Sequence, residues 1–281
     1  MTSAPLIPPP APVPTPVAAS APAAASDTAP GSGAQAAGAP RSWDGPPTVA
    51  ARGTVIVVAG RGEHPGVYER FGTRIAFDGY RVRAVGDPTR DPAGVTANIQ
   101  SLLADPDLPS PRVLAGSDAG AAFVAALAAT GAVEVDALLL VGLPADADDA
   151  ARADGDSDAD WATQLAARTA CPTHQARLDA DPAVRRDDLA RPIPSSWLVD
   201  GDLAKVTVPI LGLHGAADLI SPLAPARARY AGAPRAELVT LDGGRHDALN
   251  DATHRSAAAA VVLFLERLRL GADLPTIARW S

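Results

Sequence analysis

Apolar runs and stretches of helical spacing alternate along the chain from residue 54 onward. The runs are short and rich in Val, Ile and Leu, which predicts buried β-strands. Between them, apolar residues recur three or four positions apart, as at Tyr68, Phe71 and Ile75, which predicts helices. The predicted strands are 54–58, 80–85, 113–115, 135–142, 206–213 and 236–241, and the predicted helices are 66–78, 93–103, 119–129, 161–168 and 252–269. This alternation predicts an α/β fold, with a mostly parallel sheet covered by helices on both faces.

A group of small and polar residues follows the third predicted strand. The run ends at Gly116, and Ser117 and Asp118 come next, before a helix of small residues. Gly116 and Gly120 stand two positions on either side of Asp118, and small residues there allow a sharp strand-to-helix turn to close. Because parallel sheets bind ligands beyond the carboxyl ends of their strands, we expect Asp118 to lie at a functional edge.

Three further loops carry candidate chemistry after predicted strands. Residues 59–70 include two closely spaced glycines and a Glu-His pair, residues 211–222 include Asp218, and residues 241–251 include His246. A lone Asp or His in such a loop is a weak signal, since either is commonly a helix cap or a surface residue. Their occurrence together, each after its own strand, is a stronger signal of a functional site.

These loops resemble those of the α/β-hydrolase superfamily, and in particular those of monoacylglycerol lipases and related lysophospholipases. The resemblance covers about residues 54–270 and is carried by Gly-x-Asp-x-Gly at 116–120, Gly-x-Gly-Glu-His at 60–64 and His-Asp-x-x-Asn at 246–250. It implies a helical lid inserted in the fold, and a cofactor-free and metal-free hydrolase acting on a small or lipid-like substrate, with ester bonds favoured by the loops. Two positions depart from the pattern: Ala59 replaces the leading His, and the bulky Arg61 occupies the oxyanion position.

The resemblance also implies a role for each site residue, in the order nucleophile, acid, histidine. Asp118 stands at the nucleophile position, Asp218 orients the imidazole, and His246 is the general base. The backbone N–H groups of Arg61 and Ala119 form the oxyanion hole.

The identity of the nucleophile has more than one interpretation. A carboxylate at position 118 attacks a saturated carbon that carries a halide or an epoxide oxygen, which is similar to haloalkane dehalogenases and epoxide hydrolases. Ala119, however, stands where dehalogenases usually have Trp, and residues 144–205 contain no Tyr to protonate an epoxide oxygen. Ser117, in the frame Ala115-x-Ser117-x-Ala119, is the alternative nucleophile and restores ester chemistry. The third interpretation is a non-catalytic scaffold that binds a ligand or partner.

The organisation along the chain follows from composition and from these loops. Residues 1–46 form a Pro- and Ala-rich tail, and this composition predicts disorder. Pro interrupts every apolar run there, so we do not expect a secretory signal. Residues 47–143 form the first part of the core, 144–205 a lid insertion, and 206–281 the second part of the core.

The insertion contains several candidate contacts to a substrate. We expect Trp161, Arg168, His174 and Trp197 to take this role, together with Tyr68 from the loop after the first strand. Cys171 and His174 are too few for a zinc site. The Asp154-x-Asp156-x-Asp158 run lacks the Gly and Glu of a calcium loop, so it predicts a solvated acidic segment.

Composition limits the partners and the cellular compartment that the sequence predicts. A net charge of −8 gives no support for nucleic-acid binding, and the predicted partner is a small molecule. The single cysteine excludes an intramolecular disulfide and fits a cytoplasmic, reducing compartment. The sequence predicts no membrane span, since no 18-residue apolar stretch is free of charge and Pro. The oligomeric state stays open.

Overall fold

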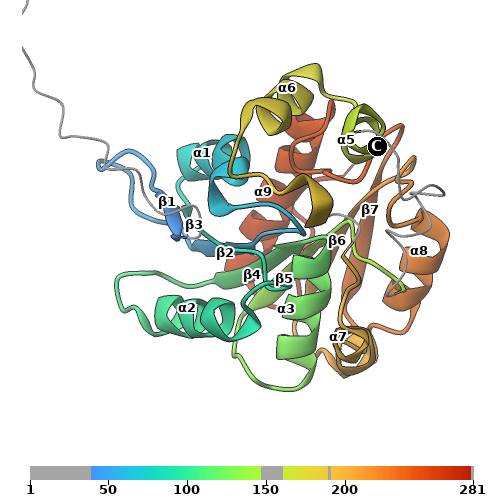
Figure 1. The fold of residues 1–281 in the computed structure, drawn as a ribbon. Helices are drawn as coiled ribbons and strands as arrows, with labels where there is room; N and C mark the ends of the chain where they lie inside the picture. The colour runs from blue at the N-terminus through green and yellow to red at the C-terminus, as the bar shows by residue number, and fades with distance from the viewer. Residues whose placement is uncertain (1–38, 147–160, 189–190, 280–281) are drawn as a thin grey trace, which may run out of the picture. The chain divides into compact units, whose positions relative to one another are not determined.

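The computed structural model describes residues 39–146, 161–188 and 191–279. Within these, a seven-stranded sheet has the order β1-β3-β2-β4-β5-β6-β7 (Figure 1). Only the edge strand β1 is antiparallel to its neighbour; the other pairs are parallel. The strands are β1 Arg41–Trp43, β2 Thr54–Val58, β3 Arg81–Val85, β4 Arg112–Ser117, β5 Ala137–Val141, β6 Ile210–Gly215 and β7 Ala236–Leu241. The predicted α/β fold with a mostly parallel sheet is confirmed.

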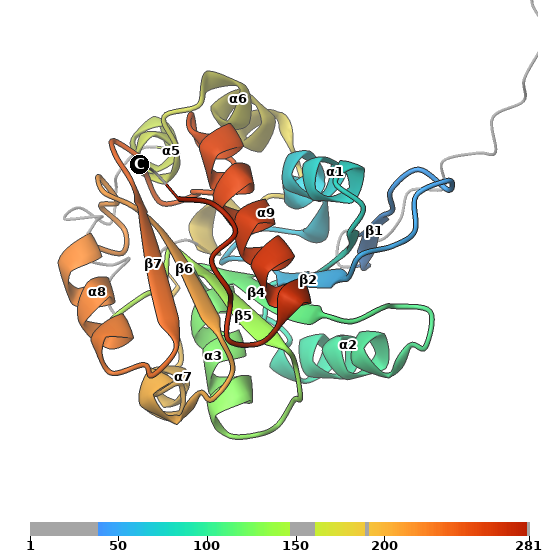
Figure 2. The ribbon, with the colours of Figure 1, turned by 180° about the vertical axis from the view of Figure 1, so that it is seen from behind.

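Helices cover both faces of this sheet. One face is packed by α1 and α9 and the other by α2, α3 and α8, as the two opposite views show (Figures 1 and 2). Strands β2 and β5 are buried along their whole length, which matches their continuous Val, Ile and Leu content. The helices of the core are η1 Pro65–Tyr68, α1 Glu69–Phe77, α2 Pro92–Ala104, α3 Ala119–Ala129, α8 Leu223–Ala231 and α9 His254–Leu270.

Local sequence explains where several elements begin. Pro92 stands in the first turn of α2, and the side chain of Asp91 accepts a hydrogen bond from the Gly94 N–H at 2.8 Å. The predicted strand at 206–213 starts later, at Ile210, because Leu203–Lys205 forms the short helix η3 and Pro209 lacks a backbone donor. Helix α8 has no counterpart among the predicted elements.

The N-terminal part differs from the prediction at one place. Residues 41–43, expected within the disordered tail, form β1 and pair with β3 in the register Ser42–Arg83. The side chain of Trp43 packs against the core cluster beside Gly72, where a Cβ atom would lie 2.4 Å from the indole ring. The segment 1–46 is therefore not uniform, and residues 1–38 lie outside the described residues.

The insertion between β5 and β6 divides between the two faces of the sheet. Helices α5 Trp161–Arg168 and α6 Pro172–Ala180 place Leu165 and Leu178 in the same cluster as α1 and α9. Helix α7 Ser195–Asp200 packs instead on α3, where Trp197 meets Phe123 with ring centroids 4.8 Å apart. The predicted acidic segment at 146–160 falls almost entirely outside the described residues. No helix in the described part of the chain combines the length and apolar character that crossing a membrane requires.

Candidate active site

Asp118 occupies a sharp turn between β4 and α3. Its backbone has φ of 52° and ψ of −124°, a conformation that L-residues other than Gly rarely adopt. The turn is closed by close backbone approach: a Cβ atom on Gly116 would lie 2.2 Å from the Gly120 carbonyl oxygen, and one on Gly120 would lie 2.5 Å from that of Val58. The spacing of small residues around Asp118 is thus a steric requirement. Strained backbone of this kind is typical of functional sites.

The histidine and acid loops meet this turn. The His246 Nδ1 atom lies 2.9 Å from Asp218 Oδ2, and its Nε2 atom lies 3.4 Å from Asp118 Oδ1. The second oxygen of Asp218 accepts hydrogen bonds from the N–H groups of Ile220 and Ser221, at 2.9 and 2.8 Å, which fix the orientation of the carboxylate. The structure therefore brings together the three side chains that the sequence predicted at separate strand ends.

A second buried histidine lies beside Asp218, and sequence reasoning did not single it out. The Nε2 atom of His214 is 3.4 Å from Asp218 Oδ2 and 2.6 Å from the Ser221 carbonyl oxygen. His214 is the fifth residue of β6, so its position in the apolar run was the available signal. His214 and His246 both approach the same oxygen of Asp218.

Arg61 binds Asp118 with its side chain as well as its backbone. The backbone N–H and the Nε–H donate to Asp118 Oδ2 at 3.0 and 2.8 Å, and an Nη2–H donates to Oδ1 at 2.7 Å. Nη1–H donates to the carbonyl oxygen of Arg191 in the insertion at 3.0 Å. The exposed fraction is 0% for Arg61 and 1% for Asp118. The sequence predicted only the backbone contribution, while Ala119, the other predicted donor, is the buried first residue of α3.

The charges at this site are strongly coupled. Burial disfavours ionisation of Asp118, but the Arg61 guanidinium and His246 outweigh it and hold the pKa of that carboxyl well below its usual range. Burial likewise opposes protonation of His246, but Asp218 and Asp118 raise the pKa of the imidazole to about 10. At neutral pH His246 is therefore an imidazolium between two carboxylates.

The alternative nucleophile Ser117 lies apart from His246. It is the last residue of β4, and its hydroxyl interacts with the Tyr68 side chain. No hydrogen bond joins Ser117 to His246 among the residues that the structure describes. Adjacent side chains diverge at the turn, so the backbone that aims Asp118 at the imidazole aims Ser117 away from it.

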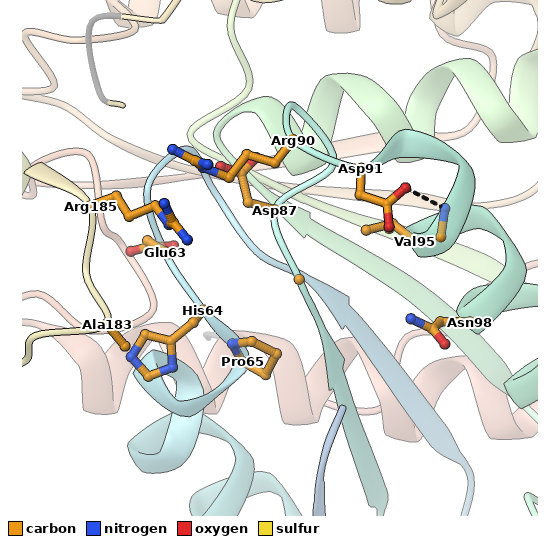
Figure 3. A pocket seen from close by; sticks show the side chains of 12 residues that line it. Glu63, His64, Pro65, Asp87, Arg90, Asp91, Val95, Asn98, Ala183 and Arg185 are labelled. Carbon is orange, nitrogen blue, oxygen red and sulfur yellow. Dashed lines mark hydrogen bonds between the residues drawn. The ribbon is translucent and has the colours of Figure 1, made fainter. Parts of the chain in front are cut away.

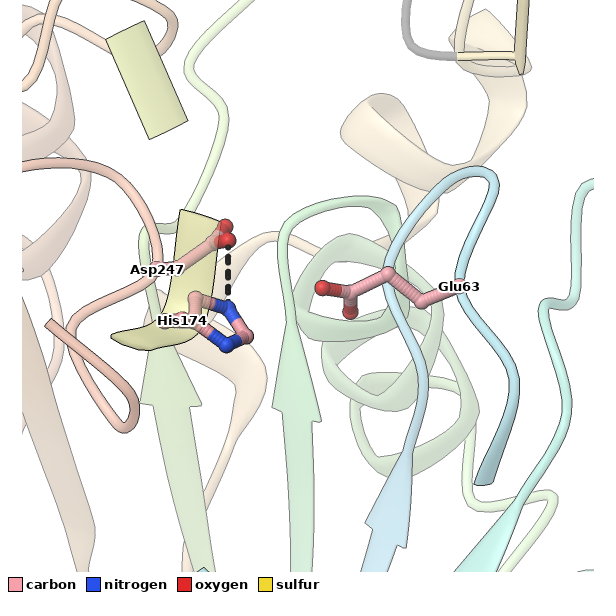
Figure 4. Close-up of side chains that lie close together, drawn as sticks. All are labelled: Glu63, His174 and Asp247. Atoms are coloured by element: carbon pink, nitrogen blue, oxygen red, sulfur yellow. Dashed lines mark hydrogen bonds and ion pairs between the residues drawn. The ribbon is translucent and has the colours of Figure 1, made fainter. Parts of the chain in front are cut away.

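A second group of buried charges joins the loops of Glu63 and Asp247 to helices α5 and α6, and Figure 4 shows three of its members, Glu63, His174 and Asp247. Arg168 from α5 sits 3.0 Å from Glu63 and 3.2 Å from Asp247, and His174 from α6 lies 3.1 Å from the same Asp247 oxygen. Burial opposes the ionised form of Asp247, but Arg168 and His174 lower the pKa of that carboxyl to about 2. Glu63, His174 and Asp247 have the residue types and spacing of a metal site, but the Arg168 guanidinium already supplies the positive charge between the two carboxylates.

The predicted substrate contacts of the insertion have other partners in this arrangement. Arg168 and His174 are each 1% exposed within the charged group just described. The Trp161 indole N–H donates to Asp179 at 2.9 Å, and Trp197 packs on Phe123. The Tyr68 hydroxyl donates to Glu63 and accepts from the Gly60 N–H, which stabilises the loop after β2. In this conformation these side chains hold the insertion and loops in place instead of lining a substrate cavity.

A cavity of about 180 Å³ opens beside the loop that carries Arg61 (Figure 3). Its wall is formed by Glu63 and His64 from that loop, by the β3–α2 connection, and by Arg185 from the insertion. The connection is tied to the loop through Asp87, whose carboxylate accepts from the Gly62 N–H at 3.0 Å. Asp118 and His246 are not among the lining residues. The carboxylate at the turn is therefore covered by the Arg61 side chain in this structure.

Comparison with known proteins places the fold. No protein-family model and no curated protein sequence matches the chain. Among solved structures, it is similar to a monoacylglycerol lipase of Paleococcus ferrophilus, with 16% identity, a TM-score of 0.62, and coverage of 83% of this chain and 98% of that one. A soluble variant of monoglyceride lipase from Saccharomyces cerevisiae matches with 15% identity, a TM-score of 0.60 and coverage of 82% and 91%. A proline iminopeptidase of Mycobacterium smegmatis matches with 16% identity, a TM-score of 0.61 and coverage of 82% and 95%. The chain has the α/β-hydrolase fold, with monoacylglycerol lipases among its structural neighbours.

Proposed function

We propose that this protein is a hydrolase in which Asp118 is the nucleophile, cleaving a bond between a saturated carbon and an oxygen or halogen atom of a small molecule. The observation that carries the proposal is the strained turn that holds Asp118 3.4 Å from the His246 imidazole, which Asp218 in turn orients. A carboxylate suits attack on such carbon, whereas its attack on an ester gives a labile mixed anhydride.

The first step is displacement. Asp118 Oδ1 attacks the carbon, a new C–O bond forms, and the bond to the leaving group breaks with its electron pair. A halide leaves as the anion, and an epoxide oxygen takes a proton from the imidazolium or from water. The product of this step is an alkyl ester on Asp118, which carries no negative charge.

The second step is hydrolysis of that ester. Loss of the Asp118 charge removes one of the two carboxylates that hold His246 protonated, so the imidazole is able to act as a base. The imidazolium first gives up its proton, to the epoxide oxygen or, when a halide leaves, to solvent. His246 then takes a proton from water, the resulting hydroxide attacks the Asp118 carbonyl carbon, and the C–O bond to the leaving alkoxide breaks. The protonated His246 returns the proton to this alkoxide, which leaves as an alcohol with the former Asp118 oxygen. The water oxygen stays in the carboxylate.

Arg61 has a defined part in both steps. Its backbone N–H and Nε–H reach Oδ2, the atom that becomes the ester carbonyl oxygen, at 3.0 and 2.8 Å. Donors at this position stabilise the negative charge that develops during hydrolysis of the ester. Its Nη2–H bond to Oδ1 has to break before that oxygen attacks. Ala119 is the proposed second backbone donor.

A second candidate function has one observation in its favour. Both oxygens of Asp118 are occupied by Arg61, and the pair is almost fully buried. A permanent ion pair at this position favours a non-catalytic scaffold that binds a ligand. Ester hydrolysis through Ser117 has less support as a candidate function, because the serine hydroxyl contacts Tyr68 and not His246.

The test is covalent trapping on the full chain. The His246→Gln variant is incubated with 1-bromohexane, styrene oxide or p-nitrophenyl acetate, and its intact mass and peptides are analysed. We expect a stable alkyl adduct on Asp118 from the bromide or the epoxide, and turnover by the parent protein and by the matched control His64→Gln. An acyl adduct on Ser117 supports an esterase. The absence of any adduct and of turnover by the parent protein supports the scaffold.

A further inference from the structure

A second cavity, of about 160 Å³, is lined by residues of α1, of α9 and of the loop before α9. The two helices cover the same face of the sheet (Figure 2). The lining of the cavity includes four basic side chains, Arg70, Arg74, His254 and Arg255, and three apolar ones, Phe71, Leu249 and Ala258. No carboxylate is among the lining residues, although the chain carries a net charge of −8. This cavity therefore concentrates positive charge in an acidic protein.

Not all of the arginines that line the cavity have an acidic partner among the described residues. Arg74 pairs with Asp78 at 3.3 Å on the surface. Arg70 donates to the neutral carbonyl oxygen of Asn250 at 3.2 Å and contacts the sulfur of Cys171. The exposed guanidinium of Arg255 has no hydrogen bond or ion pair within the described part of the chain. Two of the guanidinium groups thus face no counterion there.

The start of α9 adds to the positive potential. The helix spans 17 residues and begins with His254 and Arg255, with no acidic residue in its first turn. The amino end of a helix carries a partial positive charge, so basic residues are unfavourable there and anions are favourable. The His254 Nδ1 atom lies 3.4 Å from Arg70 Nη1, which brings the basic groups of both helices together. An anion bound in the cavity would supply the counterion that Arg70 and Arg255 lack among the described residues.

We propose that this cavity binds a small organic anion with one carboxylate or phosphate group and a compact apolar portion. The anionic group lies between Arg70, Arg255 and the amino end of α9. The apolar portion packs on Phe71, Leu249 and Ala258. The volume suits such a ligand, because an apolar cavity of about 150 Å³ accommodates a benzene ring.

The site is separate from Asp118 but touches the loop that holds His246. Leu249 lines the cavity, and the next residue, Asn250, accepts the hydrogen bond from Arg70. The Asn250 side chain also donates to the carbonyl oxygen of Val67, so the loop and η1, which precedes α1, are joined here. A ligand in the cavity therefore contacts the His246 loop at Leu249.

The test is calorimetric titration of the 281-residue chain with benzoate and phenyl phosphate, with benzyl alcohol and inorganic phosphate as comparison compounds. We expect at least one aromatic anion to bind, more weakly as NaCl is raised, and both comparison compounds to bind at least tenfold more weakly. Arg255→Gln should weaken binding on the order of tenfold. Arg227→Gln, the same change at an exposed arginine of α8 that also has no partner in the described residues, should leave it unchanged.

Hydrogen exchange gives a second readout that does not depend on a variant. The bound anion should slow amide exchange in residues 249–258 of the parent protein. Absence of binding, equal binding of benzyl alcohol, equal binding of inorganic phosphate, or equal affinities of the Arg255→Gln and Arg227→Gln proteins would each overturn the proposal. These outcomes are independent of whether Asp118 forms an adduct.

Discussion

Replacing Arg61 by Leu removes the guanidinium from Asp118 without removing the carboxylate. Asp118 is 1% exposed and, among the described residues, keeps only His246 as a charged partner within 3.4 Å. Loss of one partner of a buried ion pair destabilises proteins by about 3–5 kcal/mol, because the other charge stays desolvated. We expect Arg61→Leu to lower the free energy of unfolding by this amount. Substitution of the other partner, Asp118→Leu, should lower the free energy of unfolding by a similar amount, since it leaves a buried guanidinium without its carboxylate.

The double variant tests whether Arg61 and Asp118 stabilise the protein as one ion pair or through two independent effects. When both charges are replaced by apolar groups, no charge is left unpaired, so Arg61→Leu/Asp118→Leu should be destabilised by no more than about one single variant, that is, about 3–5 kcal/mol. Urea unfolding at pH 7, followed by circular dichroism, measures each free energy. Arg177→Leu, which breaks an exposed pair with Glu69, is the control and should cost less than about 1 kcal/mol. Additive losses in the double variant would refute the coupling of Arg61 to Asp118.

Three further predictions use the same unfolding measurement. The pKa of His246 is raised from 6.5 to about 10, so the stabilisation from its protonated imidazole is complete below pH 6.5 and is lost as the pH rises toward 10. The free energy of unfolding should therefore fall by up to about 4 kcal/mol over that pH window, and by much less in His246→Gln. Gly120→Ala should cost about 1–3 kcal/mol or more, because the added Cβ meets backbone oxygen at 2.5 Å, whereas Gly232→Ala, with its nearest atom at 3.9 Å, should be close to neutral. Arg168→Met should cost about 3–5 kcal/mol by leaving two buried carboxylates without their cation, and an effect below about 1 kcal/mol would contradict that role.

Much of the fold could be predicted because buried strands and helices have recognisable patterns of apolar and small residues in the sequence. The β-branched run at 54–58 and the small-residue helix at 119–129 were both confirmed with the same bounds. The convergence of Asp118, Asp218 and His246 also followed from sequence, since parallel strands present their carboxyl ends at one edge. Short elements with weak periodicity, such as β1 and α8, could not be identified in this way.

The side-chain directions at the site could not be predicted. Arg61 turns inward because a carboxylate 57 positions later in the chain lies within reach, and local pattern contains no information on that contact. Arg168 and His174 were expected at a substrate surface, since charged residues in an insertion are commonly exposed. They are buried instead because Glu63 and Asp247 satisfy their charges.

In the proposed mechanism, Asp118 transfers one of its own oxygen atoms to the product. A single-turnover reaction in oxygen-18 water, with protein in excess over styrene oxide or 1-bromohexane, measures this transfer directly. The mechanism predicts an alcohol whose new oxygen is unlabelled and a peptide containing Asp118 that carries the heavy isotope. Heavy oxygen in the alcohol, with an unlabelled Asp118 peptide, would mean that water attacks the substrate directly and would contradict the mechanism.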